Sequence, residues 1–329
     1  MRPHKTALIF GVSGQDGAYL AQHLLSAGWV VHGASRDREM ANFGNLHRLG
    51  IYEKVRLHSA VITDFRSVLQ LINEVRPPFV FNLAGQSSVG LSFSQPVDTL
   101  DSVTFGTINI LEALRFLKLD ARFYNAASSE CFGNTEQPAD ELTAFRPRSP
   151  YGVGKAAAFW AVANYRESYE LFACSGILFN HESPLRPARF VTQKIILGAA
   201  NIAERVSDRL ELGNLSIARD WGWAPEYVDA MTRMLLTEEP EDFVVATGQR
   251  HTLQAFCEEA FRFFGLNWRQ HVDVNEHLFR PSDIALSIGD PSKAARVLGW
   301  RAQTYMPEIV RLLANAELER RAQTRRDGH

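Results

Sequence analysis

The sequence lacks long apolar runs, and this absence limits where the protein can work. No stretch of its 329 residues approaches the roughly 18 consecutive apolar residues of a membrane span. A secretory signal is also missing, because residues 1–5 lead directly into a predicted strand. We therefore expect a cytoplasmic protein with no membrane contact.

Cysteine and excess charge are scarce as well. The three cysteines, Cys131, Cys174 and Cys257, are odd in number and widely spaced, so they make no disulfide or metal-binding pattern. The formal net charge is −2, which argues against nucleic acid as the main partner. This composition suits a globular protein in a reducing cytosol, without a metal site.

What the sequence does contain is an alternation of strands and helices. Strands are predicted at 6–10, 29–34, 55–58, 79–83, 122–125 and 174–179. Helices are predicted after residue 17 and at 65–75, 96–117 and 150–171. This alternation predicts an α/β fold with a doubly wound parallel sheet.

After residue 180 the alternation weakens. Helical patterns occur near 191–206, 223–238, 253–264, 291–298 and 306–322, with short strands near 211–212 and 244–247. We expect a cofactor-binding domain over residues 1–179, joined by a returning segment near 215–250. Residues 180–329 are then mostly a smaller substrate-binding α/β lobe.

A glycine-rich turn follows the first strand and precedes a helical pattern. It reads GVSGQDG and contains Gly11, Gly14 and Gly17. Such a turn lets the backbone approach a pyrophosphate, which then faces the helix N-terminus. Arg36 and Arg38, just after the second strand, favour the 2′-phosphate of NADP, whereas Asp37 leaves NAD open. Arg38 can alternatively belong to a solvated charged loop.

The catalytic candidates lie between residues 125 and 155. A run of two hydroxyls and a carboxylate, Ser128, Ser129 and Glu130, precedes Tyr151 and Lys155, which share one helix face. A nearby ammonium lowers a phenol pKa, so we expect Lys155 to prepare Tyr151 for proton transfer. Helices also carry YxxxK by accident, and Glu130 can alternatively cap a turn.

The polar segments that follow the strands support one site. Residues 11–17, 84–88, 128–130 and 180–186 each follow a predicted strand. Ligands of open α/β sheets bind beyond the carboxyl ends of the strands. We therefore expect these segments to meet around one ligand.

Longer motifs identify a family. The chain contains GVSGQDGAYLA, NLAGQSSV, SSE, RSPYGVGK, GILFNHESPLR, FVTQK, LGNLSIARDWG and FRPSD. Together they resemble the GDP-mannose 4,6-dehydratases, which are extended short-chain dehydrogenases/reductases with a Rossmann-type domain. The resemblance runs from residue 7 to about residue 300.

The resemblance implies roles for individual residues. Tyr151 and Lys155 match the catalytic tyrosine and lysine, Ser128 stands at the hydroxyl position, and Glu130 matches the base. The implied cofactor contacts are Gly11, Ser13, Gly14, Gln15, Asp16, Gly17, Arg36, Val61, Ile62, Leu83, Ala84, Gln86, Ser87, Tyr151, Lys155, His181 and Arg186. The implied substrate contacts are Ser88, Ser129, Asn180, Glu182, Val191, Lys194, Arg219, Arg280 and Asp283.

The resemblance also implies a reaction. An enzyme of this family oxidises C4 of GDP-mannose, eliminates water across C5 and C6, and returns the hydride to C6. The cofactor is NADP, with NAD possible, and the assembly is a homodimer or homotetramer. Val61, Asp37 and Asp283 depart from the family pattern, and so do Gly85, Ser88 and Gly90. They allow a related GDP-hexose as substrate, and a GDP-sugar 4-reductase or epimerase is the alternative.

Overall fold

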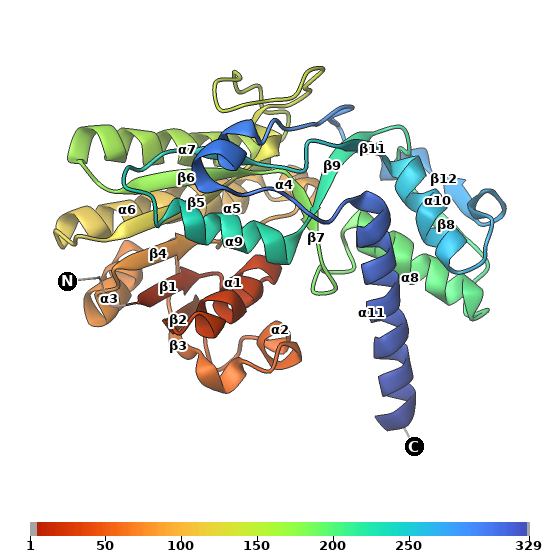
Figure 1. The fold of residues 1–329 in the computed structure, drawn as a ribbon, viewed down its shortest axis with the longest axis horizontal. Coiled ribbons are helices and arrows are strands. Elements are labelled where there is room, and N and C mark those ends of the chain that lie inside the picture. Colours follow the sequence, from red (N-terminus) through yellow and green to blue (C-terminus); the bar gives the residue numbers. More distant parts are fainter. Residues whose placement is uncertain (1–4, 328–329) are drawn as a thin grey trace.

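A computed structural model describes residues 5–327, and its largest element is a parallel sheet (Figure 1). Its seven strands run in the order β10-β6-β5-β4-β1-β2-β3. They are β1 Thr6–Phe10, β2 Val30–Ser35, β3 Arg56–Ser59, β4 Phe79–Asn82, β5 Arg122–Ser128, β6 Ala173–Leu178 and β10 Phe243–Val245. The predicted α/β fold is confirmed, and β10 joins the sheet from a segment much later in the chain.

Helices cover both faces of this sheet. They are α1 Gln15–Ser26, α3 Phe65–Val75, α6 Gly106–Phe116, α7 Pro150–Tyr169 and α9 Ala224–Met234. Alternate side chains of a strand point to opposite faces. Ala7 and Ile9 of β1 accordingly pack in one apolar cluster with residues of α1 and α9, and Leu8 and Phe10 in another with residues of α3 and α6. Burial on both faces explains why the β1 sequence is a continuous apolar run.

The C-terminal half adds a lobe with its own apolar core, at one end of the large sheet (Figure 1). Its strands are β7 Asn180–Glu182, β8 Leu210–Leu212, β9 Ala218–Trp223, β11 Arg250–Thr252 and β12 Val272–Val274. They form the sheets β11-β9-β7 and β12-β8. The lobe's helices are α8 Val191–Ala203, α10 Leu253–Phe263 and α11 Met306–Asp327. Ile196, Phe256 and Leu313 join these three helices in the core.

Two predicted helices are not regular in the structure. The helix predicted over 96–117 begins as α5 Pro96–Leu100 but then widens into a π-helical turn, Asp101–Phe105. In this turn Thr104 Oγ1 donates to Gly154 O of α7 (3.0 Å), so a tertiary contact accompanies the irregularity. The helix predicted over 291–298 is mostly a π-helical turn, Ala294–Leu298.

The remaining elements are short. They are helices α2 Gly44–Arg48 and α4 Val89–Ser94, and 3-10 turns Tyr52–Lys54, Ser129–Cys131, Trp268–Gln270 and Glu276–Leu278. None of the helices in residues 5–327 combines the length and the apolar character that crossing a membrane requires.

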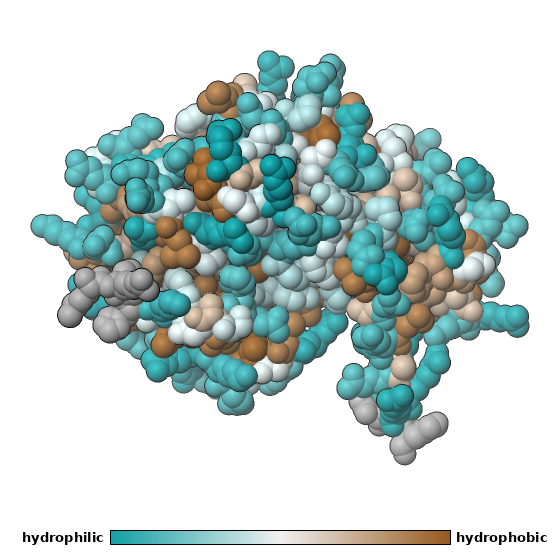
Figure 2. Space-filling view, in the orientation of Figure 1, coloured by the Kyte–Doolittle hydropathy of each residue, from teal (hydrophilic) through white to brown (hydrophobic). Residues whose placement is uncertain are grey.

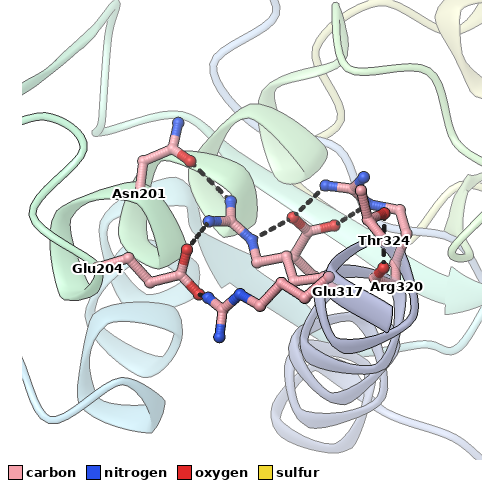
Figure 3. Close-up of polar contacts among 7 residues, drawn as sticks. Asn201, Glu204, Glu317, Arg320 and Thr324 are labelled. Atoms are coloured by element: carbon pink, nitrogen blue, oxygen red, sulfur yellow. Dashed lines mark hydrogen bonds and ion pairs between the residues drawn. The ribbon is translucent and has the colours of Figure 1, made fainter. Parts of the chain in front are cut away.

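Charged side chains hold the outer part of α11 (Figure 3). Arg321 donates to Asn201 (2.7 Å) of α8, to Glu204 (2.7 Å) just after that helix, and to Glu317 (2.6 Å) of its own helix. Burial would raise the pKa of Glu317, but hydrogen bonds from Arg320 and Arg321 outweigh it and lower this pKa. Figure 2 shows mainly hydrophilic side chains along this projecting part of the helix, whereas Met306, Ile309 and Leu313 attach its earlier turns to the apolar core.

Candidate active site

The first turn of α7 carries the predicted tyrosine, and a serine cap fixes where that turn begins. Ser149 Oγ accepts a hydrogen bond from Gly152 N (3.0 Å), and Pro150 takes the first helical position, as predicted from the sequence. Tyr151 follows directly, and Lys155 lies one turn later on the same face. Both side chains are buried.

The carboxyl ends of the neighbouring strands bring the other candidates to the same edge. Phe10 pairs with Asn82, and Asn82 with Asn125, so β1 and β4 end at one level and β5 continues beyond them to Ser128. Ser128 is the last residue of β5, and its Oγ accepts from Glu130 N (3.3 Å) in the 3-10 turn that follows. This turn directs the chain, and Glu130 with it, along the edge of the sheet.

A cavity of about 390 Å³ lies at this edge. The predicted residues that line it are Asp16, Leu83, Ala84, Gln86, Ser87, Ser88, Ser128, Ser129, Glu130, Tyr151, Lys155, Asn180, His181, Glu182, Arg186, Val191, Arg219 and Arg280. Both lobes therefore contribute to one cavity, which contains all four catalytic candidates. Its volume suits a small-molecule site.

The other predicted residues lie outside this lining. Gly11, Ser13, Gly14, Gln15, Gly17, Arg36, Val61 and Ile62 follow the carboxyl ends of β1, β2 and β3. Lys194 is turned toward the two-stranded β12-β8 sheet, where its Nζ donates to Glu211 O of β8 (2.7 Å). Asp283 reaches the cavity only through its ion pairs with Arg219 (3.3 Å) and Arg280 (3.6 Å).

The electrostatics of Tyr151 differ from the sequence expectation. Burial raises the pKa of Tyr151 above its ordinary value, and the Ser128 hydroxyl offsets this rise only in part. Lys155 does not lower it, because its Nζ donates to Ala126 O (2.6 Å) and lies 5.7 Å from the Tyr151 ring centroid. Burial also lowers the pKa of Lys155, to about 8. Tyr151 is therefore a neutral phenol beside the Ser128 hydroxyl.

Glu130 has the electrostatics of a proton-transfer group. Burial raises its pKa above the ordinary value, although the positive charges of Arg219 and Arg280 favour the carboxylate. Asp283 adds to the rise. A carboxyl whose pKa moves toward neutrality can both accept and return a proton, which is what an acid–base step requires.

An ion pair joins the glycine-rich turn to the segment after β6. Asp16 Oδ2 lies 2.9 Å from His181 Nε2, while His181 Nδ1 bonds Phe179 O (2.7 Å). Burial would raise the pKa of Asp16, but the charge and hydrogen bond of His181, with a hydrogen bond from Gln15, lower it to about 2. Burial would likewise lower the pKa of His181, and Asp16 raises it. The pair fixes the start of α1 against β7.

Replacing Asp16 tests this ion pair through stability. We expect Asp16→Asn to lower the free energy of unfolding at about pH 7 by about 2 kcal/mol, because the folded-state pKa of about 2 lies below the unfolded value of about 3.9. This contribution is present above about pH 4 and is lost as the pH falls toward 2. Chemical denaturation at neutral and acidic pH measures both effects.

Asp120→Asn is the matched control, since Asp120 is exposed and forms no hydrogen bond or ion pair with residues 5–327. An equal loss of stability in both variants would contradict the role of the ion pair. So would an acid dependence that Asp16→Asn leaves unchanged.

The glycine-rich turn fits a dinucleotide. A Cβ on Gly11, whose φ is +86°, would lie 2.7 Å from Leu83 O, and one on Gly17 would lie 2.2 Å from Gly11 O. These close approaches keep the turn tight where a diphosphate would pass. Within the described residues, no side chain caps the first amides of α1, because Gly14 occupies the N-cap. Those amides are available to an anion.

Sequence reasoning missed several cavity residues. Arg189, Phe190 and Thr192 line the cavity, and so does Trp221, for which no ligand contact was predicted. Thr192 Oγ1 donates to Glu182 Oε2 (2.7 Å) and thereby supports a predicted residue. Arg189 could have been found from the sequence, because it lies three residues after Arg186 in the polar stretch that follows a predicted strand. Trp221 had no such signal, because its strand β9 belongs to a sheet that the sequence does not order.

The chain is similar to known proteins over nearly its whole length. Residues 8–313 match the family model described as GDP-mannose 4,6 dehydratase. The GDP-mannose 4,6 dehydratase 2 of Arabidopsis thaliana is 43% identical over 329 residues, covering 97% of this chain and 88% of the relative.

Solved structures share the fold at lower identity. A UDP-glucose 4-epimerase from Thermus thermophilus, in complex with NAD, has a TM-score of 0.84 at 23% identity and covers 94% of this chain and 98% of its own. RMD from Pseudomonas aeruginosa, complexed with NADPH, has a TM-score of 0.79 at 22% identity. The match covers 96% of this chain and 99% of RMD. The family match and the identity over nearly the whole chain show that this protein belongs to the GDP-mannose 4,6-dehydratase family.

Proposed function

We propose that this enzyme converts GDP-mannose to GDP-4-keto-6-deoxymannose, as a dehydratase. The observation that carries the proposal is the position of Glu130 in the same cavity as Tyr151, Ser128 and Lys155. A 4-reductase or 4-epimerase needs the hydroxyls and the lysine but no carboxyl at C5. The raised pKa of Glu130 supports dehydration. The relatives named GDP-mannose 4,6 dehydratase support the same reaction.

The proposed roles follow from the placement of each side chain. Tyr151 acts as the phenolate: once its Oη has released its own proton to solvent, it takes the proton of the sugar C4 hydroxyl, which Ser128 Oγ helps to hold. Glu130 then removes the C5 proton, which the C4 ketone acidifies. The C6–oxygen bond breaks, a double bond forms between C5 and C6, and the oxygen leaves as water with the proton that Glu130 took from C5. When bound, the nicotinamide cofactor would supply hydride transfer, from C4 and back to C6. Glu130 then takes a proton from solvent and passes it to C5, which balances the proton that Tyr151 took from the C4 hydroxyl.

Two arginines suit the diphosphate of the substrate. Arg219 and Arg280 line the cavity, and Asp283 pairs with both. Arginine binds phosphate oxygens by charge and by paired N–H donors. We therefore propose that the GDP portion binds in the C-terminal lobe, and the nicotinamide dinucleotide on residues 1–179 with the returning segment near 215–250. Lys194 is left as a weak candidate because Glu211 O already holds its ammonium.

A mass measurement tests the function. The protein is incubated with GDP-mannose and a catalytic amount of NADP, and the molecular mass of the product is measured by mass spectrometry. We expect loss of one water without net consumption of cofactor. A product that instead consumes one NADPH per molecule would favour the 4-reductase, and an isomer of unchanged mass would favour the epimerase.

The cofactor is proposed to be NADP rather than NAD. Arg36 follows β2, is exposed, and forms no hydrogen bond or ion pair with other residues in 5–327. Asp37 is occupied locally, since its Oδ1 accepts from Glu39 N (2.9 Å) and Met40 N (3.3 Å). Asp37 is therefore present to hold this turn, although it lies close to the place where a 2′-phosphate would bind. RMD, whose structure contains NADPH, has the same fold.

Replacing Arg36 tests this preference. We expect Arg36→Ala to weaken NADP binding roughly tenfold to a hundredfold, which corresponds to one charge-assisted hydrogen bond, and to leave NAD binding unchanged. Fluorescence titration of each cofactor measures both constants. Arg38→Ala is the control, because Arg38 Nε pairs with Glu39 (2.8 Å). Equal effects on NADP and NAD would contradict the assignment.

The enzyme is proposed to be a homodimer or homotetramer that works in the cytoplasm. Large apolar side chains are exposed on the adjacent helices α6 and α7 and the π-helical turn before α6, and they include Phe105, Phe116, Val153 and Trp160. Burying such a patch between subunits is favourable. The three cysteines are free and buried, as a reducing compartment permits.

Trp160→Glu tests the assembly. Trp160 is 63% exposed, so a charge there should leave the subunit folded but lower the molar mass toward the monomer. Light scattering after size-exclusion chromatography measures that mass. Leu142→Glu, on a loop at 92% exposure, is the control and should change nothing. A monomeric wild-type protein would contradict the proposal.

A further inference from the structure

A second cavity lies between the two lobes, and nothing in the proposed reaction uses it. Its volume is about 220 Å³. The walls come from the end of α2, the loop after β7, and helices α8 and α11, which Figure 1 shows around that loop. Among the described residues, Arg186 alone lines both this cavity and the catalytic one. We refer to it as the interlobe cavity.

The charge of the interlobe cavity favours an anion. Arg48, Arg186 and Arg320 line it, against one carboxylate, Glu317. Arg320 is paired with Glu317 (2.7 Å), and Arg186 Nε lies 3.3 Å from Glu182 Oε2 without hydrogen-bond geometry. Arg48 forms no hydrogen bond or ion pair with any other residue in 5–327. Its guanidinium is therefore available to a ligand.

A buried amide in the wall has no partner. Gln193 is only 8% exposed, and its Oε1 accepts no hydrogen bond within the described chain. Leaving a buried amide unpaired costs roughly 1–3 kcal/mol, so such a group usually has a partner such as a water, an ion or a ligand. The side-chain amide can rotate so that its N–H group faces the cavity in place of Oε1, and this N–H group can donate a hydrogen bond to a phosphate oxygen.

The rest of the wall is apolar. Leu197, Leu313 and Ala316 face the cavity from α8 and α11, with Pro184 and Ala188 from the loop. The volume lies below the roughly 300–1,000 Å³ of drug-sized sites, so the ligand must be compact. We propose that the interlobe cavity binds a small organic phosphate monoester, with its phosphate on Arg48, Arg320 and Gln193 and its carbon part against the two leucines.

Two probes test this proposal on the full-length protein. Inorganic phosphate supplies the anion alone, and phenyl phosphate adds a compact apolar ring. Isothermal titration at constant ionic strength measures affinity. We expect phenyl phosphate to bind roughly tenfold more tightly than inorganic phosphate, because part of its ring leaves water. We also expect it to raise the melting temperature, because the ligand contacts both lobes. Absence of binding, or equal affinity for the two probes, would overturn the proposal.

Variants locate the bound probe. Arg48→Ala should weaken phenyl phosphate binding at least tenfold, and Gln193→Leu, a change of similar volume, should weaken it while the unliganded protein stays as stable or becomes more so. Arg66→Ala, an exposed arginine outside both cavities, and Arg280→Ala, in the catalytic cavity, should leave binding unchanged. Loss of binding in Arg280→Ala with full affinity in Arg48→Ala would place the probe in the catalytic cavity and refute the interlobe site.

Discussion

Glu130→Gln is expected to abolish dehydration while leaving the first oxidation intact. The amide keeps the size and shape of the side chain but cannot take the C5 proton. Removing a general base costs about 10²–10⁴ in rate. We therefore expect reduced cofactor and a 4-keto sugar to accumulate, with little product that has lost water. Mass spectrometry follows the sugar, and absorbance follows the cofactor.

The physical reason lies in the setting of Glu130. Burial raises its pKa above the ordinary value, while the charges of Arg219 and Arg280 favour its ionised form. Exchange of deuterium into C5 from heavy water gives a second readout, which should disappear in the variant. A structural carboxylate would lower stability without this selective loss.

Glu136→Gln is the matched control, on the same loop after β5 but exposed and outside both cavities. It should dehydrate at the normal rate. Normal dehydration by Glu130→Gln would show that another group removes the C5 proton, and the alternative reading of Glu130 as a turn cap would stand.

The sequence predicts well the parts of this site that depend on local order. A serine and a proline before Tyr151 predict the start of α7, and the structure has that cap. Several predicted strands are apolar and end in polar segments, which predicts that these segments meet at one edge of the parallel sheet. Most of them line one cavity in the structure. These features follow from capping, strand alternation and the parallel sheet, each of which leaves a short-range pattern.

Contacts between distant segments could not be predicted in this way. Asp16 and His181 are far apart in sequence, and nothing local to either residue indicates that they form an ion pair. The pairing of Asp283 with Arg219 and Arg280 likewise depends on how the C-terminal lobe folds. Such pairs arise from tertiary packing, which is set by β7 and β9 joining in one small sheet.

The sequence predicted that Lys155 lowers the pKa of Tyr151, and this prediction is wrong, because the pKa is raised. The four-residue spacing predicts that Lys155 is near Tyr151, but it does not say where the ammonium points. In the structure Ala126 O accepts from Lys155 Nζ, and burial acts on both groups. Spacing on a helix fixes a face. The balance between burial and charge depends on neighbours from other elements.

Tyr151→Phe is expected to stop the reaction at its first step. Without the hydroxyl, no group remains at this position to take the C4 proton, so hydride cannot leave C4. We expect a fall in rate of about 10²–10⁴, with no reduced cofactor and no 4-keto sugar. The phenyl ring keeps the packing of this buried side chain, so the melting temperature should change little. Single-turnover absorbance of the cofactor measures the step directly.

A second tyrosine of the same helix provides the control. Tyr165 Oη donates to Glu112 Oε2 (2.9 Å), far from the cavity lining, so Tyr165→Phe should keep full activity. If Tyr151→Phe still oxidised C4, the Ser128 hydroxyl would be the remaining group able to take the proton, since it faces the same position. Because Ser128→Ala removes that hydroxyl and keeps the phenol, comparing the two variants decides which oxygen accepts the C4 proton.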